Sequence, residues 1–93
     1  MIPDAAAIRI EMLRQLQARG VAKSICPSEV ARALAPEWHG LMKRVRDVAI
    51  TLMREGRIDI LRKGRPVALA AVEPQAGAEI KGVIRLRLRP DPA

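Results

Sequence analysis

Cysteine and histidine are the side chains with which this sequence could perform nucleophilic or metal chemistry, and it contains one of each. Cys26 and His39 lie thirteen positions apart on different predicted elements, and no second thiol or imidazole can complete a catalytic pair. A zinc site needs more nitrogen and sulfur ligands than these two residues offer. Cys26 could be a reactive thiol at the start of a helix, or it could simply cap that helix. We therefore predict a protein that is not an enzyme and that uses no metal or cofactor.

Recognition of a polyanion is the second kind of chemistry that the residue types allow. On a helical wheel centred on Val45, the outward face of a predicted helix carries Lys43, Thr51 and Arg54. Arg44 lies at the edge of that face. Such donors can contact the base edges and phosphates of duplex DNA. The candidate DNA-binding set is completed by cations from the connection that follows the helix, namely Lys63, Arg65 and Lys81.

The same charges also have a structural interpretation. Asp47 sits near the middle of the outward face, where it would repel phosphate and can pair with a lysine one turn earlier. A row of alternating cations follows near the C-terminus, formed by Arg85, Arg87 and Arg89. This row could follow a phosphate backbone, or Asp59 could neutralise one of its members across a hairpin. Because the chain has no Phe or Tyr on which single-stranded bases could stack, duplex DNA is the favoured nucleic acid.

A protein partner is the alternative from a different class. We expect Ile50 to be exposed on the same helix, and residues 67–72 form an apolar segment that is unusual for a solvated loop. Apolar surface that stays exposed is typical of protein interfaces. The partner would be a second copy of the chain or a larger protein. The interface residues predicted on this basis are Ile50, Val67, Leu69 and Val72.

Composition favours a small basic domain of the cytoplasm. The 93 residues suit a single domain over 1–93, and 49% of them are hydrophobic, with Trp38 as the only Phe, Trp or Tyr. The net charge of +7 favours polyanionic partners, although many small basic proteins bind none. One cysteine cannot form an internal disulfide and fits a reducing compartment. The pattern of a secretory signal is missing, and no apolar run is long enough for a membrane span.

Helical periodicity predicts three helices that would position these side chains. Apolar residues repeat at helical spacing between Asp4 and Gly20. Cys26, Pro27 and Glu29 then form a capping-box pattern that begins a second helix, which ends before Pro36. The third helix extends from residue 38 to residue 55.

The remaining sequence predicts strands. Residues 57–61 and 84–89 alternate like half-buried strands, and the connector over 21–25 can pair with them as an edge strand. The long connection over about 64–82 would be a wing, and residues 90–93 a frayed tail. Together the elements predict an α+β fold, a winged helix-turn-helix with three helices and a C-terminal β-hairpin wing.

Spaced stretches of the chain carry a family resemblance. They are residues 25–34, Trp38, Leu41-Met42, Val45-Arg46, residues 63–67 and residues 82–86. In this combination the chain resembles a short bacterial winged-helix family of unknown function. The wing is longer than expected for that family, and Val83 stands where the family often has Pro. The resemblance implies the fold, and it implies no activity, cofactor or functional residue.

Overall fold

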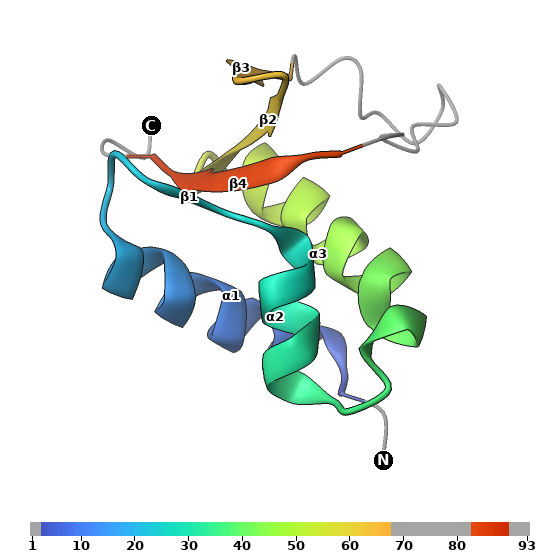
Figure 1. Cartoon of the computed structure of the whole chain (residues 1–93). Helices are drawn as coiled ribbons and strands as arrows, with labels where there is room; N and C mark the ends of the chain where they lie inside the picture. The colour runs from blue at the N-terminus through green and yellow to red at the C-terminus, as the bar shows by residue number, and fades with distance from the viewer. Residues whose placement is uncertain (1–2, 68–82, 90–93) are drawn as a thin grey trace.

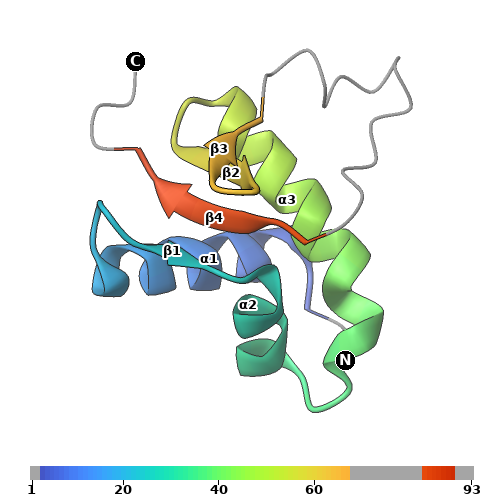
Figure 2. The same ribbon diagram turned by 45° about the horizontal axis from the view of Figure 1, so that its top comes forward.

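The helices gather on one side of a four-stranded antiparallel sheet (Figures 1 and 2). The structure is a computed structural model, and it describes residues 3–67 and 83–89. The elements follow one another as α1 (Ala5–Arg19), β1 (Ser24–Ile25), α2 (Pro27–Leu34), the 3-10 turn η1 (Trp38–Leu41), α3 (Met42–Arg54), β2 (Ile58–Arg62), β3 (Arg65–Pro66) and β4 (Arg85–Leu88). This confirms the predicted α+β class with three helices, in a winged-helix-like arrangement. None of the described helices is both long and apolar enough to span a lipid bilayer.

The helix ends are fixed by the residues that the sequence pattern indicates. The Asp4 carboxylate accepts the backbone N–H of Ala7 at 2.9 Å and caps the start of α1, and Gly20 is the C-cap that follows its last residue. At α2 the capping box is confirmed, because the Glu29 carboxylate accepts the backbone N–H of Cys26 at 2.7 Å. The chain leaves α3 through Gly56, whose φ of 78° is the left-handed conformation expected of a helix end.

The third predicted helix is divided into a 3-10 turn and an α-helix. The turn η1 begins at Trp38, whose partly buried ring packs against the core. The guanidinium of Arg32 lies 4.6 Å from the centre of the Trp38 ring. The His39 ring stacks on the Trp38 ring, with 3.7 Å between the two ring centres. Gly40 in the middle of the turn is a poor α-helix former. The regular helix α3 therefore begins at Met42, four residues later than predicted.

One aliphatic core joins the helices to the sheet. The predicted apolar stripes of α1 and α3 are confirmed, since both point into it. The core residues are Ile8, Met12, Leu16, Ile25, Val30, Ala31, Leu41, Val45, Val48, Ala49, Leu52, Met53, Ile58, Ile60, Ile84 and Leu86. Leu61 is also buried, although the alternation along β2 places it on the other face of the sheet, between Arg85 of β4 and Pro66 of β3.

The sheet has the strand order β1-β4-β2-β3. The predicted hairpin is its central pair, β2 and β4, and one short strand is added on each side. The expected edge strand is confirmed as β1, which pairs with β4. The second addition, β3, was not predicted from the sequence. It forms because Lys63 and Gly64 both have positive φ, 53° and 78°, as the two central residues of a tight hairpin turn require. Of the predicted wing over 64–82, only the first four residues lie within the described part, and residues 90–93 lie outside it.

Candidate nucleic-acid interface

The turn between β2 and β3 concentrates positive charge. Arg62, Lys63 and Arg65 are all exposed, and the strand register places Arg62 directly opposite Arg65. We call residues 62–65 the basic turn. Within residues 3–67 and 83–89, none of these three cations forms an ion pair with a carboxylate. Like charges that face each other across two strands repel. The basic turn is therefore a place where a bound anion would lower the energy of the domain.

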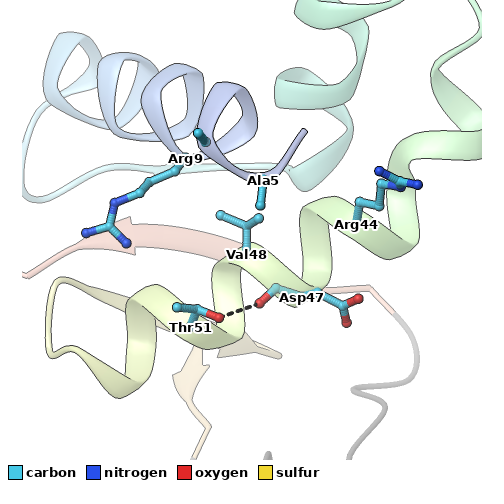
Figure 3. A pocket seen from close by; sticks show the side chains of 7 residues that line it. Ala5, Arg9, Arg44, Asp47, Val48 and Thr51 are labelled. Carbon is cyan, nitrogen blue, oxygen red and sulfur yellow. Dashed lines mark hydrogen bonds between the residues drawn. The ribbon is translucent and has the colours of Figure 1, made fainter. Parts of the chain in front are cut away.

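The donors of α3 do not form one surface. Arg44 and Thr51 line a groove between α3 and α1, together with Ala5 and Val48 (Figure 3). The Thr51 hydroxyl donates to the backbone carbonyl oxygen of Asp47 at 3.2 Å, and its donor is therefore already used. Lys43 and Arg54 are exposed and do not line this groove. The predicted recognition face thus divides into a side turned toward α1 and a side turned away from it.

Lys43 and Asp47 form the pair that the structural interpretation predicts. The Lys43 ammonium lies 3.7 Å from the Asp47 carboxylate, and both side chains are exposed, at 79% and 62%. An ion pair of this exposure contributes little to stability, because water and salt screen it. Phosphate could replace Asp47 as the partner of Lys43 at small cost, although Asp47 would still repel it.

The groove has a volume of about 330 Å³ and a floor of small apolar groups. Arg9 forms one edge, and its guanidinium donates to both carboxylate oxygens of Glu55 at 2.9 and 2.7 Å. This contact raises the pKa of Arg9 and lowers the pKa of Glu55 from their usual values. The groove thus joins a floor of small apolar groups to charged side chains along its edges.

The arginine row of β4 is tied into the sheet by its neighbours. Arg87 donates to the Asp59 carboxylate at 3.0 Å, and Arg89 lies 3.9 Å from the same group. This confirms the cross-strand pair and disfavours a row of free cations. Arg85 donates to the Ser24 hydroxyl at 2.7 Å, to the Ser24 carbonyl oxygen at 3.0 Å and to the Cys26 sulfur at 2.9 Å. Nowhere in the described residues do three His, Cys, Asp or Glu side chains gather as metal ligands would.

Ile50 is less exposed than predicted, and its role at an interface stays a prediction. Ile50 and Val67 are both partly buried and pack against the core. Because α3 contacts α1, α2 and β2, more of its surface is covered than one apolar stripe indicates. The other two interface residues predicted, Leu69 and Val72, lie outside the described residues, as does Lys81 of the DNA-binding set.

Two functional candidates were missed by sequence reasoning. Arg62 was overlooked because β3 was not predicted, although Lys63-Gly64 is a plausible two-residue turn that would have placed Arg62 opposite Arg65. Ile10 is 69% exposed on α1, where a large apolar side chain is unexpected. Its position opposite the buried residues of the helix could have been found on a helical wheel.

The fold and the basic turn together define a small α+β domain of winged-helix-like architecture with a cationic hairpin. The family described as "Protein of unknown function (DUF3253)" matches residues 5–89, and the chain belongs to that family. No curated protein matches the chain.

Proposed function

We propose that this domain binds duplex DNA without catalysing a reaction, as a DNA-binding or accessory regulatory protein. The observation that carries the proposal is the basic turn, where three exposed cations lie in or directly beside a two-residue turn and have no carboxylate partner among the described residues. Lys and Arg side chains that neutralise phosphates provide most of the affinity in such complexes, because they release counterions from the nucleic acid. The basic turn would therefore hold the DNA backbone.

The outward side of α3 would supply the second contact. Lys43 and Arg54 are about 20° apart on a helical wheel, so both can face the same groove of a duplex. The hairpin of β2 and β3 lies beside the C-terminal half of α3 in both views (Figures 1 and 2), and Arg54 is the last residue of α3. Arg44 and Thr51, which were predicted in the same set, lie on the α1 side and are not required for this contact.

Binding to a random duplex pool, titrated across salt and followed by sequencing of the bound DNA, tests the proposal. Each phosphate contact contributes about 0.9 to the slope of log affinity against log salt. We expect the double variant Arg62→Ala/Arg65→Ala to bind more weakly and to lower this slope by about 1.8. Arg14→Ala is the matched control, because Arg14 is also exposed but binds Glu11 on α1.

The outcomes separate three situations. Tight binding with an enriched motif indicates a sequence-specific regulator, and binding without enrichment indicates backbone contacts alone.

Asp47→Asn should strengthen binding, because it removes the one carboxylate on the outward face of α3. No binding at low salt, or equal salt slopes for the double variant and the Arg14→Ala control, would refute the proposal.

A further inference from the structure

The solvent side of α1 carries an apolar stripe in a protein that is otherwise strongly charged. Ile10 is 69% exposed, Ala6 one turn before it is exposed, and Leu13 one turn after it is partly buried. Residues three and four apart lie on the same side of a helix. We call these three residues the α1 stripe. No basic or acidic side chain interrupts it.

The groove between α1 and α3 opens directly beside the α1 stripe. Ala6 belongs to both, and with Ala5 and Val48 it gives the groove an apolar floor (Figure 3). The groove volume of about 330 Å³ is sufficient for a branched aliphatic side chain. One surface of the molecule therefore presents a protruding Ile10 next to a cavity that could receive such a side chain. A surface that is complementary to itself is what a twofold symmetric contact requires.

The charges around the α1 stripe are balanced. Arg9 on one flank binds Glu55 through two hydrogen bonds of 2.9 and 2.7 Å. Arg14 on the other flank binds Glu11 through two hydrogen bonds of 2.9 and 2.6 Å. Two copies of a chain with a net charge of +7 repel each other over most of their surface. The two flanks carry no net charge, so a second copy can approach here with less repulsion than elsewhere, whereas an acidic partner would gain little.

We infer that the α1 stripe binds a second copy of this chain. Two α1 helices would cross in antiparallel orientation about a twofold axis, with each Ile10 seated near Ala6 of the other copy and reaching into its groove. A contact built on one helix of 15 residues is small compared with a standard interface, so the dimer should be weak. In Figure 1, α1 and β3 lie on opposite sides of the molecule, so both basic turns would remain accessible.

Analytical ultracentrifugation of the full chain without nucleic acid tests the inference, independently of any DNA binding. We expect a reversible monomer–dimer equilibrium with the weak dissociation constant that a small interface gives. Dimerisation should strengthen as salt is raised, because salt screens the repulsion between two positively charged copies. Ile10→Asp should raise the dissociation constant at least about tenfold, because it introduces a charge into an apolar contact. Val21→Asp is the control, since Val21 is also exposed but lies outside the α1 stripe.

A second variant addresses the groove without disturbing the fold. Ala6→Glu places an acid in the first turn of α1, where the helix dipole favours it, and fills the position that would receive Ile10. It should also weaken dimerisation while its melting temperature stays at or above that of the wild type. A wild-type chain that remains monomeric at the highest concentration would overturn the inference. Equal dimer dissociation constants for Ile10→Asp and Val21→Asp would also overturn it.

Discussion

Replacing Glu29 by Ala and by Gln separates two contributions to the stability of α2. The carboxylate accepts the Cys26 backbone N–H at 2.7 Å and binds the Arg19 guanidinium at 2.7 Å. The capping hydrogen bond is worth about 1 kcal/mol. The ion pair adds only about 0.5 kcal/mol, because both side chains are more than a third exposed and water screens them. We expect Glu29→Ala to cost about 1.5 kcal/mol and Glu29→Gln about 0.5 kcal/mol, since the amide oxygen can keep the capping bond.

Urea denaturation followed by circular dichroism at neutral pH measures both values. The melting temperature should fall by roughly 4–8 °C for each kcal/mol lost from the free energy of unfolding in a domain of this size. Glu37 provides the control, because its side chain makes no capping hydrogen bond at η1 and Glu37→Ala should change stability little. Equal losses for Glu29→Ala and Glu29→Gln would refute the separation of a capping term from a charge term.

The pH dependence of the same variants tests the charge term. The capping N–H of Cys26, followed by Arg19, lowers the pKa of Glu29 below its ordinary value of 4.5. A carboxyl whose pKa is lower in the folded state contributes stability that is fully present above pH 4.5. That contribution is lost as the pH falls through the folded pKa. The stability difference between wild type and Glu29→Gln should therefore shrink under acid conditions. A difference that stays constant down to about pH 2 would contradict the assignment.

Three further predictions concern the core, the basic turn and the sheet. Leu52→Ala should lower the free energy of unfolding by about 2–5 kcal/mol, because the side chain is fully buried and its removal leaves a cavity. Gly64→Ala should cost about 1 kcal/mol in the same denaturation assay, because φ is 78° there and a β-carbon strains the turn even though the space around it is open. Asp59→Ala should destabilise the sheet by about 1 kcal/mol, less so in high salt, because Arg87 and Arg89 lose the carboxylate between them.

Local patterns along the chain were sufficient to predict the helices and the central hairpin. Apolar spacing identified the buried face of α3, and Glu29 three residues after Cys26 identified the start of α2. Gly56 marked the end of α3. These features depend on contacts within a few residues, which is the distance over which capping and helical periodicity act.

The candidate site was harder to predict, because it depends on which elements meet. A helical wheel gives the angle of Ile50 around α3, but it does not say that a neighbouring element covers that angle. The division of the α3 donors has the same origin, since Arg44 and Thr51 face α1 only once the helices have packed. Arg62 became a candidate through the pairing of β2 with β3, which rests on a two-residue turn.

The two outer strands of the sheet have a consequence for how other chains can associate with it. Within the described residues β1 and β3 form the sheet edges, and each is only two residues long. Pro66 in β3 has no backbone N–H to donate. A foreign strand would find almost no ladder of free amides and carbonyls to extend, which protects such a small sheet against fibril-like growth. A partner that approaches either of these two edges would therefore have to contact side chains, because the edges offer little backbone for sheet-mediated association.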